Sequence, residues 1–92
     1  LLPSVQIYVQ SVLPINQDLH LIRREYYNNE KIDLLNSMIK ELQGGSVKYL
    51  DLNSHFKDSE GNLNREYSSD GLHLNGSGYQ KWKNILIQES IM

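Results

Sequence analysis

The sequence contains no cysteine, which excludes a disulfide framework and thiolate chemistry. It also lacks any apolar run near the ~20 residues that a membrane-spanning helix needs, so no transmembrane segment is predicted. Neither sign of charge dominates, because nine Lys and Arg residues oppose eleven Asp and Glu residues. The net charge of -2 and the pI of about 5.9 give no reason to expect nucleic acid or an anionic membrane as a partner.

The length allows at most one small domain. A chain of 92 residues buries only about 60–65% of the surface that its unfolded state exposes, so its stability is marginal. A hydrophobic content of 39% is nevertheless ordinary for a globular protein. No secretory signal peptide is visible, and because the chain begins with Leu1 rather than Met, its compartment is not readable.

The first predicted element is a strand at residues 5–13, which are rich in β-branched and aromatic side chains. Pro14 ends this strand in a loop that carries Asn16. Loops at the carboxyl ends of parallel strands line the ligand crevice of α/β sheets, so Asn16 is a candidate substrate contact. The alternative is that Asn16 serves turn chemistry alone. Residues 18–27 are polar and aromatic without a clear period, and we interpret them as a surface excursion.

A helix and a second strand follow. Asn28 and Asn29 offer a helix cap, and an apolar stripe then recurs at helical spacing up to the glycines at 44 and 45. The stripe comprises Ile32, Leu35, Met38, Ile39 and Leu42. Met38 is interpreted as a core residue, and residues 47–52 as the second strand. Strand, helix, glycine turn and strand make a βαβ unit whose crossover is long enough for parallel pairing.

The second strand is followed by Asp51, His55 and Asp58, a grouping that invites a metal interpretation. Such groupings are common on protein surfaces, and no further convergent ligand is evident, so no metal site is predicted. Asp51 is better interpreted as a cap for the following turn. The last element is a helix over residues 77–91, in which Trp82 is expected to pack in the core.

The most informative stretch runs from Tyr67 to Tyr79. Asp70 stands three residues before His73, and Gly71 between them makes a tight turn easy. An Asp that orients a His and fixes its tautomer is the base half of a hydrolytic triad. Asn75 is then a plausible N-cap, with Leu74 and Tyr79 placed as a hydrophobic staple that would fix how the loop enters the helix. By itself the Asp-x-x-His spacing is also compatible with a purely structural turn.

The longer string, with Gly78-Tyr79 and Trp82 after residues 70–75, resembles the closing block of the SGNH (GDSL) hydrolases. The family's pattern there is an Asp-Gly-x-His segment, then a Gly-Tyr at the head of the C-terminal helix. Upstream, residues 9–14 look like its fourth strand, and residues 49–52 look like its last strand. Phe56 and Gly61 resemble the loop that precedes the triad block. The match covers most of the chain, from about residue 5 to 91.

This resemblance implies a flavodoxin-like three-layer α/β/α fold with a parallel sheet, of which residues 1–92 supply the last two strands and the C-terminal helices. It implies hydrolysis of an ester, either an O-acetyl group on a carbohydrate or a lipid acyl group, without a cofactor. By the same resemblance His73 is the general base, and Asp70 orients it and stabilises the imidazolium.

The family's earlier blocks are absent: a Gly-Asp-Ser segment with the nucleophile, then a Gly and a Gly-x-Asn that line the oxyanion hole. Ser4, Ser11 and Ser37 have no suitable context for a nucleophile. We therefore expect the chain alone to be inactive, with its sheet completed by a missing N-terminal segment, a companion chain or a second copy. The alternative is a non-catalytic α/β binding or scaffold module in which Asp70 and His73 are structural.

Overall fold

The computed structural model describes residues 5–19 and 27–91. Most of the excursion predicted at 18–27 therefore lies outside the described residues. The elements in chain order are β1 (Ile7–Gln10), α1 (Asn29–Lys40), β2 (Val47–Leu50), α2 (Asn53–Phe56) and α3 (Gly76–Gln88).

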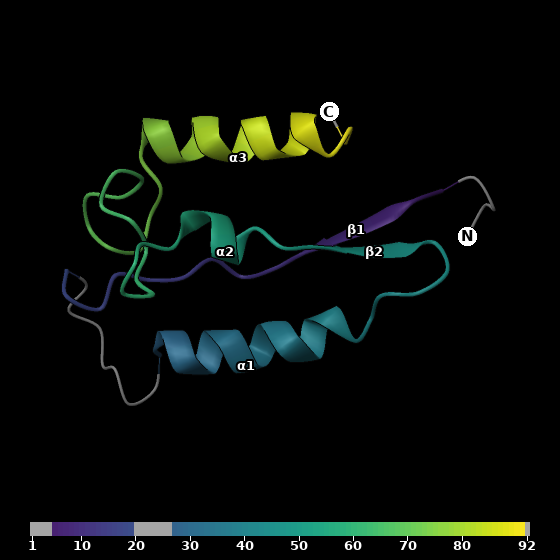
Figure 1. The fold of residues 1–92 in the computed structure, drawn as a ribbon, viewed down its shortest axis with the longest axis horizontal. Helices are drawn as coiled ribbons and strands as arrows, with labels where there is room; N and C mark the ends of the chain where they lie inside the picture. The colour runs from purple at the N-terminus through teal and green to yellow at the C-terminus, as the bar shows by residue number, and fades with distance from the viewer. Residues whose placement is uncertain (1–4, 20–26, 92) are drawn as a thin grey trace.

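The two strands form a parallel pair in which Ile7 lies opposite Val47 and Gln10 lies opposite Leu50. Helix α1 is the crossover between them and runs along one face of the pair, whereas α3 runs along the other face (Figure 1). These three layers confirm the predicted α/β fold with a parallel sheet. The loops at the carboxyl ends of both strands gather at one end of the molecule (Figure 1).

Strand β1 is shorter than the predicted strand at residues 5–13. Ser11 still donates its N–H to the carbonyl of Leu50 at 3.0 Å, but the ladder stops there. The next residue, Val12, gives its N–H to Asn36 Oδ1 at 2.8 Å and accepts from Asn36 Nδ2 at 2.9 Å. After Ser11, the side chain of a helical residue, Asn36, satisfies the backbone hydrogen bonds that the neighbouring strand would otherwise supply. The β-branched and aromatic composition of residues 5–13 does not predict this change of partner.

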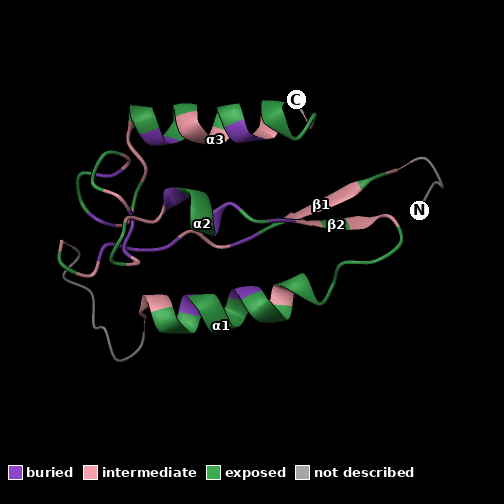
Figure 2. Cartoon of the chain, in the orientation of Figure 1, coloured by how far each residue is buried: buried purple, intermediate pink, exposed green. Residues whose placement is uncertain are grey.

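Helix α1 begins as predicted, since the Asn28 side chain accepts the N–H of Lys31 at 2.9 Å. It ends at Lys40, before the glycine turn. The interpretation of Met38 as a core residue is wrong, because Met38 is 59% exposed. A pair of four-residue strands covers only part of a wide apolar stripe, so the buried positions of α1 form a narrow line (Figure 2). The largely exposed apolar residues of this segment are Leu34, Leu35, Met38 and Leu42.

The main hydrophobic cluster lies between β2, α2 and α3, and its buried members are Leu50, Leu52, Phe56, Leu63 and Ile85. Phe56 meets Tyr67 edge to face, with ring centroids 5.4 Å apart. The short helix α2 was not predicted. Asp51 binds the turn that follows it, as expected of that residue, because its carboxylate accepts the N–H of Ser54 at 3.1 Å and the Ser54 hydroxyl.

Helix α3 starts at the predicted cap, since Asn75 Oδ1 accepts the N–H of Gly78 at 2.9 Å. Trp82 is half-buried against the core, and its Nε1 donates to Gln10 Oε1 at 2.9 Å. The expectation that Trp82 packs in the core is thus confirmed in part. Tyr79 is 58% exposed and stacks on Trp82, and the staple with Leu74 stays a prediction.

Gly78 allows the loop before α3 to lie against the helix. A Cβ at this position would approach the carbonyl oxygen of Tyr67 to 2.7 Å and the side chain of Leu74 to 2.9 Å. We expect Gly78→Ala to destabilise the protein by about 1–3 kcal/mol despite alanine's better helix propensity, because backbone must move. Denaturant unfolding measures this change. Gly76→Ala is the matched control, since nothing lies within 4 Å of that Cβ. Equal stability of the two variants would contradict the close contact.

Candidate active site

The Asp70 carboxylate and the His73 imidazole are paired. Asp70 Oδ2 lies 2.7 Å from His73 Nδ1. The two side chains are 52% and 77% exposed, so the pair lies at the surface of the chain. Because Nδ1 is occupied by the carboxylate, Nε2 is the ring nitrogen left to exchange a proton with a reacting group.

The second carboxylate oxygen, Asp70 Oδ1, is held by the loop itself. It accepts the backbone N–H groups of Leu72 and His73, both at 2.8 Å. The hydrogen bond from the His73 ring, followed by those from the two backbone groups, holds the pKa of the Asp70 carboxyl well below its usual value. The Asp70 carboxyl is therefore ionised at neutral pH.

The turn that carries the pair is tied to the interior at two points. Gly71 has a φ of 85°, a left-handed conformation that favours glycine. Its N–H donates to Ser68 Oγ at 3.0 Å, and its carbonyl accepts the N–H of Asn16 at 2.8 Å. The loop after β1 thus contacts the loop that bears His73, as expected of two loops at the same end of a parallel sheet.

Asn16 is 2% exposed, and both polar atoms of its side chain form hydrogen bonds. Its Nδ2 donates to the carbonyl of Leu63 at 2.9 Å, and its Oδ1 accepts the N–H groups of Asp18 and Leu19. These are the bonds of an Asx-type turn, the alternative role considered for this residue. A direct contact between Asn16 and substrate stays a prediction.

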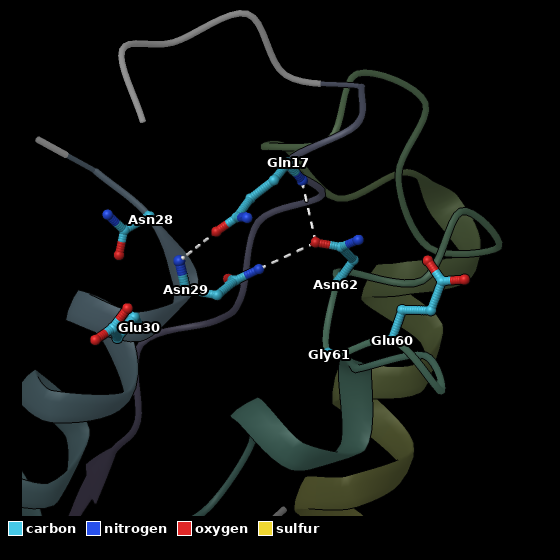
Figure 3. A pocket seen from close by; sticks show the side chains of 7 residues that line it. All are labelled: Gln17, Asn28, Asn29, Glu30, Glu60, Gly61 and Asn62. Carbon is cyan, nitrogen blue, oxygen red and sulfur yellow. Dashed lines mark hydrogen bonds between the residues drawn. The ribbon is translucent and has the colours of Figure 1, made fainter. Parts of the chain in front are cut away.

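A pocket of about 350 Å³ lies between the start of α1 and the turn around Gly61 (Figure 3). Its walls are carboxamides and carboxylates, supplied by Gln17, Asn28, Asn29, Glu30, Glu60 and Asn62. The side chains of this pocket bind one another and the backbone: Asn29 Nδ2 donates to Asn62 Oδ1 at 3.3 Å, and Gln17 Oε1 accepts the backbone N–H of Asn29. Gln17, which lines this pocket, directly follows Asn16 in the chain, but neither Asp70 nor His73 lines it.

The described residues contain no group of three or more His, Asp or Glu side chains that could hold a metal ion. None of the described helices is long and apolar enough to cross a membrane. Two of the serines judged unsuitable as nucleophiles have structural partners: Ser11 Oγ accepts the N–H groups of Leu52 and Asn53, and Ser37 Oγ donates to Leu34 O. Ser4 lies outside the described residues.

Ser68 also lies beside the pair: it is 1% exposed, and its hydroxyl lies 3.3 Å from Asp70 Oδ1. The sequence did not single out this residue. Its position two residues before Asp70 was the only available signal, and serine before a turn is too common to be informative.

The chain is similar to two known proteins over most of its length. The chain is 38% identical over 83 residues to an N-acylneuraminate cytidylyltransferase of Escherichia coli O18:K1:H7 (strain RS218 / NMEC), a match that covers 90% of this chain and 18% of that protein. It is also similar to a solved structure from Streptococcus pneumonia, provisionally described as a platelet activating factor. That match has a TM-score of 0.85 and 30% identity, and it covers 99% of this chain and 44% of that one.

The chain therefore spans less than half the length of either relative. The family model of the GDSL-like lipases and acylhydrolases matches residues 1–81, which is most of the sequence. The parallel βαβ unit agrees with the α/β fold of the structural relative. On these grounds the chain belongs to the GDSL-like lipase/acylhydrolase family.

Proposed function

We propose that this chain is the C-terminal portion of a serine esterase domain, in which His73 is the general base and Asp70 orients it. The observation that carries the proposal is the 2.7 Å contact between Asp70 Oδ2 and His73 Nδ1 in a chain of the GDSL-like family. An ionised carboxylate on Nδ1 selects the tautomer whose Nε2 accepts a proton.

The proposed reaction is acyl transfer through a covalent intermediate. His73 Nε2 takes the proton of a serine hydroxyl as that oxygen attacks the ester carbonyl, and then delivers it to the departing alkoxide. Water, activated by the same nitrogen, hydrolyses the acyl-enzyme. Throughout, Asp70 stabilises the imidazolium by its charge and does not take up the proton.

The nucleophile and the oxyanion-hole donors are proposed to lie on polypeptide outside these 92 residues. The open edges of a two-stranded sheet and the exposed apolar residues of α1 support a need for further chain. Either the preceding segment of a longer protein or a second copy would satisfy this need.

A carbohydrate O-acyl ester is the substrate class that we favour. The relative from Escherichia coli is named for an N-acylated sugar, and this name is what favours a carbohydrate ester. A lipid ester is the second candidate, because the structural relative is described by the name of a phospholipid ester, platelet activating factor.

A fluorophosphonate probe tests the proposal, because it reacts covalently with activated serines. We expect the full-length protein that carries this chain to be labelled at a serine within a Gly-Asp-Ser segment upstream of Leu1, as located by peptide mass spectrometry. We expect an isolated 92-residue chain to remain unlabelled. A full-length protein with no such segment and no labelling would instead favour the non-catalytic module.

A further inference from the structure

We propose that Ser68 is a positioning residue for hydrolysis: its buried hydroxyl holds the Asp70 carboxylate and, through it, the His73 ring. This inference rests on the proposed function. Ser68 is 1% exposed, and its Oγ lies 3.3 Å from Asp70 Oδ1.

The direction of the hydrogen bonds at Ser68 follows from its neighbours. The N–H of Gly71 points at Ser68 Oγ at 3.0 Å and uses one of its lone pairs. The hydroxyl has one proton to donate, and Asp70 Oδ1 is an ionised acceptor within reach. Ser68 therefore links the backbone of the turn to the carboxylate that the turn presents.

Burial makes Ser68 different from the other groups that bind Asp70. The paired side chains are 52% and 77% exposed, so they are not held by packing. Ser68 lies at the start of the same loop inside the protein, where water cannot readily take the place of a lost hydroxyl. At 3.3 Å its bond to Asp70 is long for a hydroxyl donor, so its part is to restrain the direction of the carboxylate rather than to bind it strongly.

Ser68→Ala in the full-length protein tests the inference, with p-nitrophenyl acetate as the substrate. We expect kcat to fall about five- to tenfold with KM within twofold of wild type, because an ordinary hydrogen bond is lost from the support of the base. Ser68→Thr, which keeps the hydroxyl, is expected to retain most of the activity. Ser69→Ala is the matched control and should keep wild-type kcat, since Ser69 is the next serine in the chain and its side chain is exposed.

A double-mutant cycle separates positioning from a general structural role. If Ser68 acts through the carboxylate, Ser68→Ala should change kcat less than twofold when Asp70 is already Asn. An equal loss in both backgrounds would show that Ser68 only supports the fold, and wild-type kcat in Ser68→Ala would likewise overturn the inference. Should Ser68→Ala fail to fold, Ser68→Cys carries the same test with a weakened donor.

The activities of Asp70→Asn and His73→Ala distinguish a failure of the proposed function from a failure of the Ser68 inference. If Asp70→Asn and His73→Ala keep full activity, the assignment of the base fails, and the role of Ser68 fails with it. If both abolish activity while Ser68→Ala matches Ser69→Ala, the base assignment stands and only the Ser68 inference is overturned.

Discussion

Replacing His73 with alanine is expected to lower kcat of the full-length protein by about four orders of magnitude, with a much smaller change in KM. In the proposed mechanism the nucleophilic serine loses the group that takes its proton, while the substrate-binding surfaces remain. The variant should fold normally, because the His73 side chain is 77% exposed. Steady-state hydrolysis of p-nitrophenyl acetate and a thermal unfolding curve measure the two effects.

His55→Ala is the matched control for this experiment, because His55 is an exposed histidine on α2. Its turnover should equal that of wild type. Asp70→Asn should reduce kcat by a similar order to His73→Ala, since an amide cannot stabilise the imidazolium. If His73→Ala turned over at the wild-type rate, His73 would not be the base.

The second large effect is expected at Asn36, whose side chain binds both polar backbone groups of Val12. Asn36 is 6% exposed, so Asn36→Ala should leave the N–H of Val12 without a partner. We expect a loss of about 2–3 kcal/mol in the free energy of unfolding. The Val12 carbonyl keeps a bond from Asn53 Nδ2, which limits the cost. Denaturant unfolding of the full-length protein measures it.

Asn84→Ala is the control for this substitution. Asn84 is also an asparagine within a helix, but it is exposed and binds only Gln80 among the described hydrogen bonds. Both variants gain the same helix propensity, so the difference between them isolates the bonds to Val12. Equal unfolding free energies would show that Asn36 does not hold the chain after β1.

The sequence was sufficient for those features that depend on neighbours in the chain. Asn28 and Asn75 were predicted as helix caps and are caps, because a cap needs only its own first turn. The Asp70–His73 contact spans three residues and is equally local. The exposure of Met38 could not be predicted, since helical spacing shows which face is apolar but not what covers it.

The polar groups that support the candidate site could not be predicted either. Asn36 and Ser68 are buried polar residues whose partners lie on a distant segment and across a turn. These side chains matter because they bind backbone N–H groups that would otherwise lack a partner, and only folding brings the two together. Asn16 differs, because its turn role was considered from the sequence and its side chain makes the bonds of such a turn. Sequence reasoning predicted the contact between Asp70 and His73 but not most of the polar groups that support it.

Each hydrogen bond described for the Asp70 carboxylate comes from residues 68–73. The geometry of the Asp70–His73 pair is thus encoded within a single short segment. The loop after β1 meets this segment through the backbone contact from Asn16 to Gly71, and its side chains supply none of the described bonds to the carboxylate. This short turn can therefore persist while the side chains around it change.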